Sequence, residues 1–78
     1  MKKDELIRCC EEAVKTEESA NQIYMKHLSA VLMRTDIPEK DLRQARETLQ
    51  HLILMNTEHK RVLEALLVRI RKEDIDVY

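Results

Sequence analysis

The sequence has no glycine, no phenylalanine and no tryptophan, and only one proline. Tight β-hairpin turns depend on glycine at positive φ, and strands are enriched in aromatic and β-branched residues, so a β-sheet protein is not expected. A glycine-rich phosphate-binding loop is excluded for the same reason. Glu, Lys, Arg, Leu and Ala dominate instead, which is the composition of long helices. The composition therefore predicts an all-α fold.

An excess of charge of either sign is also missing. The 14 basic and 15 acidic residues leave a formal net charge of −1, without the basic footprint of a protein that binds nucleic acid or an anionic membrane. The segment Met1–Glu5 becomes acidic at once, and no apolar run reaches the roughly 18 residues of a membrane span. We therefore expect a cytoplasmic protein with neither nucleic acid nor membrane as a partner.

The two cysteines, Cys9 and Cys10, are adjacent. On a helix their side chains point about 100° apart, so they are poorly placed to form a disulfide with each other. No serine or cysteine stands at a recognisable spacing from a histidine and an acid, and nucleophilic catalysis is not predicted.

Apolar periodicity divides the chain into two long helices, at about residues 4–34 and 38–72, joined by a turn at residues 35–37. A connection this short makes the helices antiparallel neighbours, so residues 1–78 are predicted to form one helical-hairpin domain. The last residues, 73–78, are expected to fray.

The second helix has the signals of a capped start. Asp36 has the side chain of an N-cap, and Glu39 stands three residues later as its capping-box partner. Pro38 suits the first helical turn, where its missing N–H leaves no bond unmade. We expect the helix to begin there.

Each helix has a seam of mostly apolar residues with alternating steps of four and three. The first seam is Leu6, Cys10, Ala13, Glu17, Ala20, Tyr24, His27 and Val31, and the second is Leu42, Ala45, Leu49, Leu52, Asn56, His59, Leu63, Leu66 and Ile70. Further apolar residues flank both seams, so the apolar face is wider than a two-stranded coiled coil needs. A chain this short also needs unusually good packing or oligomerisation. We therefore expect a homodimer or higher homo-oligomer that forms a four-helix bundle.

Polar residues interrupt the seams. Glu17 and Asn56 stand at similar distances from the turn, and His59 follows one helical turn beyond Asn56, so we expect a carboxylate, an amide and an imidazole to converge in the bundle. Two-fold symmetry would bring a second set close to the first, and these donors suit iron, manganese or zinc. His27 is interpreted as a core histidine, and His51 as solvated.

Two segments resemble the ferritin-like superfamily of di-iron carboxylate proteins, which includes the rubrerythrins. Glu17 precedes Tyr24 by seven positions, as a ligand glutamate does in the first ligand helix of that family, and the segment from Asn56 to His59, followed by Leu63, resembles its Glu-x-x-His motif. The chain has one such helix pair, as in encapsulated-ferritin-like half-bundles. The resemblance implies that Glu17 and His59 are metal ligands, that Tyr24 lies near the metal, and that any enzymatic activity is of the ferroxidase type, in iron oxidation or storage.

Asn56 departs from this family pattern, because a neutral amide stands where the family has a bridging glutamate. A symmetric dimer would offer two carboxylates and two imidazoles, which balance one divalent ion. A second interpretation therefore remains open: Glu17, Asn56 and His59 form a polar layer that only sets register in a non-enzymatic oligomerisation or interaction module. A role as docking or encapsulation cargo also remains open, although no separate targeting tail is evident.

Overall fold

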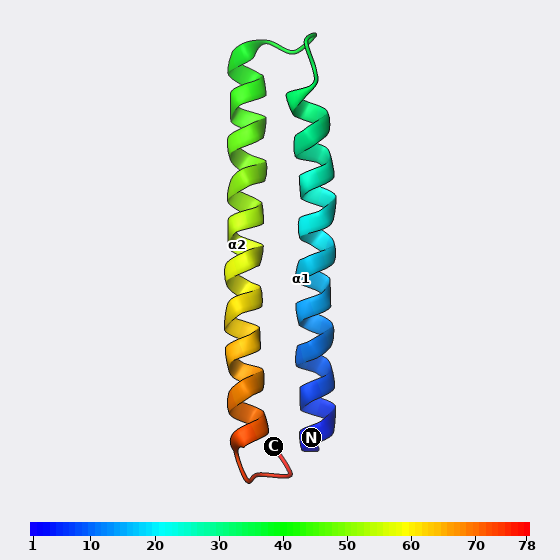
Figure 1. Ribbon diagram of the computed structural model, residues 1–78, viewed down its shortest axis with the longest axis vertical. Helices are drawn as coiled ribbons and strands as arrows, with labels where there is room; N and C mark the ends of the chain where they lie inside the picture. Colours follow the sequence, from blue (N-terminus) through cyan, green and yellow to red (C-terminus); the bar gives the residue numbers. More distant parts are fainter.

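The protein is a two-helix hairpin. The computed structural model describes residues 1–78, with helix α1 at Lys3–Leu32 and helix α2 at Glu39–Lys72. The helices run antiparallel and side by side, with the turn at one end and both termini at the other (Figure 1). The predicted all-α helical hairpin is confirmed, although α1 ends two residues before position 34. Neither helix combines enough length with enough apolar residues to cross a lipid bilayer.

The turn differs from the predicted capping box. Helix α2 begins at Glu39, and Pro38 occupies its N-cap position without a side-chain cap. The Asp36 carboxylate instead accepts two hydrogen bonds from the Arg34 guanidinium, at 2.7 Å from Nε and 2.6 Å from Nη2. The hydrogen bond from Arg34 is the main reason that the pKa of Asp36 falls to about 2. The prediction of Asp36 as an N-cap was wrong because a nearby guanidinium engages its carboxylate.

Residues 73–78 fold back on the start of α1, so the prediction that they fray was also wrong. Lys2 and Val77 form an antiparallel β-bridge, and the backbone N–H of Lys3 donates to the carbonyl of Asp76 at 2.8 Å. The Lys3 ammonium donates to the carbonyl at the C-cap of α2 at 2.7 Å. These bonds satisfy backbone groups that the two helix ends would otherwise leave without partners.

The buried core lies near the end that carries the termini, which we call the open end. Its buried residues are Cys10, Leu67 and Ile70, and the half-buried residues packed against them are Leu6, Ile7 and Val14. No other residue of the chain is buried. Toward the turn, the seam residues Val31, Leu42 and Leu49 are only half-buried. One hairpin alone therefore buries little apolar surface.

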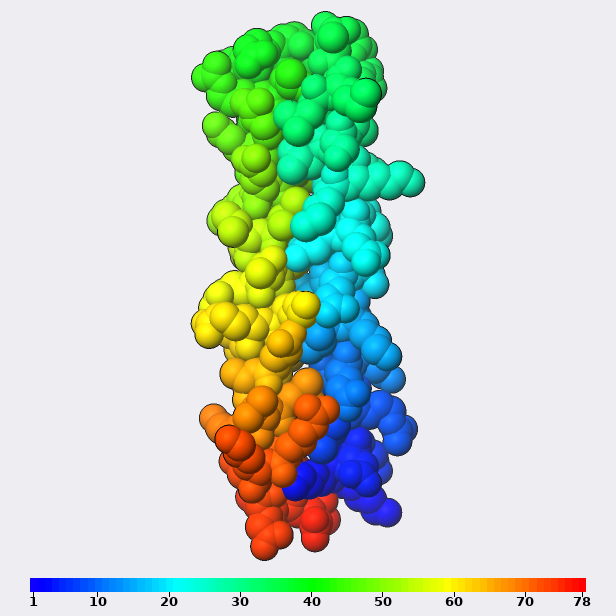
Figure 2. All heavy atoms as spheres, viewed as in Figure 1, coloured from blue at the N-terminus to red at the C-terminus, as the bar shows by residue number.

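The molecule is a narrow pillar of 57 × 14 × 14 Å (Figure 2). Its radius of gyration is 17.6 Å, whereas a compact domain of this length would have a value of roughly 11–12 Å. Its accessible surface is 6156 Å², against about 5,000 Å² for a compact chain of 9.3 kDa. The hairpin therefore exposes about 1,200 Å² more surface than a compact monomer of the same mass.

Candidate functional site

Glu17 and His59 come from opposite helices and meet near the middle of the hairpin. Glu17 Oε1 and His59 Nδ1 lie 3.4 Å apart, a distance that makes an ion pair when the imidazole is protonated. The Glu17 side chain is 24% exposed and the His59 side chain 52% exposed. The carboxylate is thus partly enclosed by the hairpin, while the imidazole extends toward solvent.

A second cross-helix pair is formed by the next residue of each helix. Glu18 Oε1 lies 2.9 Å from Lys60 Nζ. Because successive helical residues point about 100° apart, the Glu17–His59 pair lies on one side of the line where the helices touch and the Glu18–Lys60 pair lies on the other. We call these the His59 side and the Lys60 side of the hairpin.

Near Glu18 and Lys60, the Lys60 side has polar groups that are largely paired, while Met25 and Val68 on its outer part are exposed. Lys60 contacts Glu64 as well, at 3.7 Å, and the hydrogen bond to Glu18 is the main cause that raises the pKa of Lys60. The Asn21 side-chain amide donates to Thr57 Oγ1 at 3.1 Å. Thr57 Oγ1 in turn donates to a backbone carbonyl one turn earlier in α2, at 2.8 Å. These contacts link the two helices through charges and hydrogen bonds.

Asn21 and Thr57 belong to this central polar belt but were not predicted from the sequence. Asn21 Oδ1 is buried and has no hydrogen-bond donor. The available signal was positional: Asn21 follows Glu17 by one helical turn, and Thr57 follows Asn56 directly. These positions alone do not pair the two side chains, because the pairing also depends on the rotation of each helix about its axis.

The His59 side has a row of exposed apolar residues on α2. Met55, Val62 and Leu66 are 42%, 54% and 36% exposed. On an α-helix they lie within about 60° of His59, in the direction away from Lys60. We call these three residues the apolar stripe. His59 therefore lies along one edge of an exposed apolar stripe.

Helix α1 contributes smaller residues to the same side. Ala13 and Ala20 are half-buried and lie about 40° and 60° from Glu17, in the direction away from Glu18. His27 lies on this side as well and is exposed in the chain, so it is not the core histidine that the seam predicted. The seam assigned it to the interior because helical spacing cannot tell the middle of an apolar face from its edge.

The remaining predicted residues are placed as follows. Asn56 is half-buried and precedes His59 by three residues, so the two side chains are neighbours on α2. Tyr24 is half-buried, Cys9 and His51 are exposed, and the Cys10 thiol is free and buried. His51 is thus solvated, as predicted.

One hairpin holds an incomplete set of metal donors. Glu17 and His59 provide a carboxylate and an imidazole, and Asn56 provides a neutral amide oxygen. No group of three or more His, Cys, Asp and Glu side chains in the chain lies close enough to hold a metal ion. Two charged or basic donors fall short of the four ligands that a protein usually gives a zinc or iron centre. A metal centre at this position would need donors from outside the chain.

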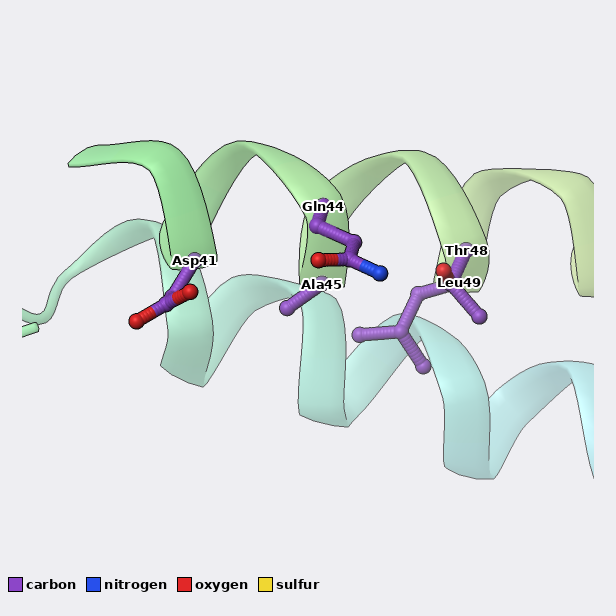
Figure 3. Close-up of a pocket in the computed structure, with 5 residues that line it drawn as sticks. All are labelled: Asp41, Gln44, Ala45, Thr48 and Leu49. Atoms are coloured by element: carbon purple, nitrogen blue, oxygen red, sulfur yellow. The ribbon is translucent and has the colours of Figure 1, made fainter. Parts of the chain in front are cut away.

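A shallow hollow near the turn does not complete the site. It is lined by Asp41, Gln44, Ala45, Thr48 and Leu49. All five side chains come from α2, as Figure 3 shows. Polar groups that converge from several elements are characteristic of ligand sites, and here only one helix supplies them.

Comparison with known protein families, with curated proteins and with solved structures finds no match to this chain. The ferritin-like resemblance therefore stays a prediction from the sequence motifs at Glu17, Tyr24 and His59.

Proposed function

We propose that this chain assembles through its His59 side into a ferritin-like four-helix bundle, as a homodimer or higher homo-oligomer, and binds a transition metal between subunits. Iron is the favoured metal, with manganese and zinc as alternatives. The proposal depends on one observation: Glu17 and His59, from opposite helices, lie 3.4 Å apart and border an exposed apolar stripe.

The exposed surface supports the assembly. A stable protein interface buries about 800 Å² per partner, and the hairpin exposes about 1,200 Å² beyond what a compact chain of its mass exposes. The stripe of Met55, Val62 and Leu66 would lose contact with water in such an interface. Each such side chain contributes about 1.5–3 kcal/mol when it becomes fully buried.

The donor chemistry supports the metal. Two copies joined at the His59 side would bring together two Glu17 carboxylates and two His59 imidazoles, which is a four-donor set for a divalent transition metal. Two negative charges balance one such ion. Asn56, next to His59 on the helix, would add an amide oxygen but no charge. The proposal is therefore a single-ion centre that would serve iron oxidation or storage.

A second candidate is a helical interaction module without a metal. The observation in its favour is the same contact, because a carboxylate and an imidazole at ion-pair distance already satisfy each other. Glu17, Asn56 and His59 would then fix the register of the bundle, as single polar core residues do in coiled coils.

The two candidates are separated by measuring metal content and oligomer mass together. We would load the purified protein with ferrous iron, manganese or zinc, remove excess metal, and determine metal per chain by elemental analysis. The test variants are Glu17→Ala and His59→Ala. The matched controls are Glu18→Ala and Lys60→Ala, which remove the neighbouring pair at the same level of the hairpin.

The metal proposal predicts about one ion per two chains in the wild type and in both controls, with less than about a tenth of this in both test variants. If the wild type retains none of the three metals, the metal centre is refuted. Unchanged oligomer mass in that case, together with altered stability in Glu17→Ala and His59→Ala, would support the interaction module.

A further inference from the structure

The His59 side differs in side-chain size between its two helices. On α2 the side chains of Val62 and Leu66 are large, whereas α1 has Ala13 and Ala20 around the same levels. At the level of Met55, α1 has large residues too, Ile23 and Tyr24. The two stretches lie side by side, because Glu11 contacts Arg71 at 3.4 Å and Glu17 contacts His59 at 3.4 Å. At the levels of Ala13 and Ala20, the side chains of α2 on this face therefore project further from the hairpin than those of α1.

Two symmetric arrangements can bring two copies of this face together. If the two-fold axis runs along the hairpin, both turns lie at the same end and α1 of each copy packs on α2 of the other. If the axis crosses the hairpin, the turns lie at opposite ends, and α1 packs on the partner's α1 while α2 packs on the partner's α2. We call these the same-end and opposite-end arrangements.

We propose that a second copy of this chain docks in the same-end arrangement, an inference that extends the proposed function by specifying how its partner is oriented. In this arrangement, Val62 and Leu66 of each α2 cover the stretch of the partner's α1 that has Ala13 and Ala20. The opposite-end arrangement sets small residues against small and large against large, which leaves voids between the α1 helices and crowding between the α2 helices. Close packing at a normal interhelical distance of about 8–10 Å favours the first.

In the same-end arrangement, each residue lies at the same height along the bundle in both copies. Val62 and Leu66 of one copy then face the partner at the level where α1 has Ala13. Each Glu17 lies beside the His59 of its own chain and faces the His59 of the other. The same-end arrangement brings all four proposed donors to one level by symmetry, whereas the opposite-end arrangement does so only when it is centred on Glu17 and His59.

Cys9 provides a native probe of the orientation. It is exposed and lies about 80° from Glu17 on the His59 side, toward the open end. In the same-end arrangement it faces the partner near Leu66. In an opposite-end arrangement centred on Glu17 and His59, it faces the partner near His27, which occupies the same angular position five helical turns further along α1.

The experiment uses two single substitutions and disulfide formation. Leu66→Cys and His27→Cys are incubated separately with oxidised glutathione and with a chelator, and dimers are detected by non-reducing electrophoresis. Cys9→Ser is added to each variant as a control, because the link between copies requires the native thiol. The wild type reports any link between the native cysteines.

The proposal predicts a covalent dimer for Leu66→Cys that disappears with Cys9→Ser, and at least tenfold less dimer for His27→Cys. The reverse pattern would show the opposite-end arrangement and overturn the inference. If the native mass is that of one chain and neither variant forms a cross-link, the inference is overturned, and so is the proposal of a four-helix bundle. Because the chelator excludes metal from this assay, a Leu66→Cys dimer from a protein that binds no metal would retain the docking mode and refute only the metal centre.

Discussion

The two sides of the hairpin meet at one seam but differ in chemistry at the level of Glu17. On the Lys60 side, Lys60 pairs with Glu18 and Glu64, and Asn21 bonds to Thr57. On the His59 side, one Glu–His contact lies beside exposed methionine, valine and leucine. Paired charges are well solvated at a surface, whereas exposed apolar side chains in a row are characteristic of interfaces. The comparison indicates which side is suited to solvent and which to a protein partner.

This difference arises from single steps in the sequence. Glu17 and Glu18 are the same residue type in adjacent positions, yet one contacts an imidazole and the other an ammonium. A shift of about 100° around the helix therefore decides between a candidate ligand and an ordinary surface ion pair. Adjacent residues of this hairpin are natural controls for each other.

The largest expected effect comes from placing a charge on the apolar stripe. Val62→Lys should weaken self-association by at least about 100-fold, or 2.7 kcal/mol, because an ammonium would have to be desolvated at the interface without a partner. Analytical ultracentrifugation over a concentration series measures this change.

The matched control is Val68→Lys. Val62 and Val68 are both on α2 and are 54% and 50% exposed, but Val68 lies on the outer part of the Lys60 side. We expect its association constant to stay within about twofold of the wild type, as for other surface substitutions. Equal weakening by the two variants would show that the two sides do not differ as proposed.

An intermediate effect is expected at Asn56, which stands at the first position of the segment that resembles a Glu-x-x-His motif. Asn56→Glu should strengthen metal binding at least about tenfold, because each copy would then add a carboxylate to the donor set. The glutamine of Asn56→Gln is as long as the glutamate of Asn56→Glu but uncharged, so this variant should keep a metal affinity near that of the wild type. Metal titration followed by calorimetry measures both. No gain in Asn56→Glu would place the metal, if any, away from this position.

The smallest effect concerns the turn, which belongs to neither side. The Arg34 hydrogen bond holds the pKa of Asp36 at about 2, below its usual 3.8. Because the folded-state pKa is lowered, the pair stabilises the fold at pH values above the usual pKa of aspartate. This stabilisation is lost as the pH falls from about 4 through about 2. Carbon-detected NMR titration of Asp36 measures the pKa. Arg34→Gln should raise it toward the usual value without changing the oligomer mass. A wild-type pKa near 3.8 would contradict the pairing.

The helices could be predicted from the sequence because spacing alone places Leu67, Ile70 and Cys10 on buried faces. Counting residues outward from the turn placed Glu17 level with Asn56 and His59 one helical turn beyond, whereas in the structure Glu17 contacts His59. Asn21 and Thr57 could not be assigned in this way, because the partner of a polar residue depends on the rotation of both helices about their axes. The Asp36 cap failed for a related reason, since two partners competed for one carboxylate and the sequence does not rank them.

The chain ends meet at the open end, where the Met1 amino group donates to the Tyr78 carbonyl oxygen at 2.7 Å. A circular permutant can therefore be made by joining these ends with a few residues and cutting the original connection between residues 33 and 38. The helices would keep their packing, and the new ends would emerge at the opposite pole of the 57 Å pillar. Fluorescent labels attached there would report on assembly without crowding the Lys2–Val77 bridge.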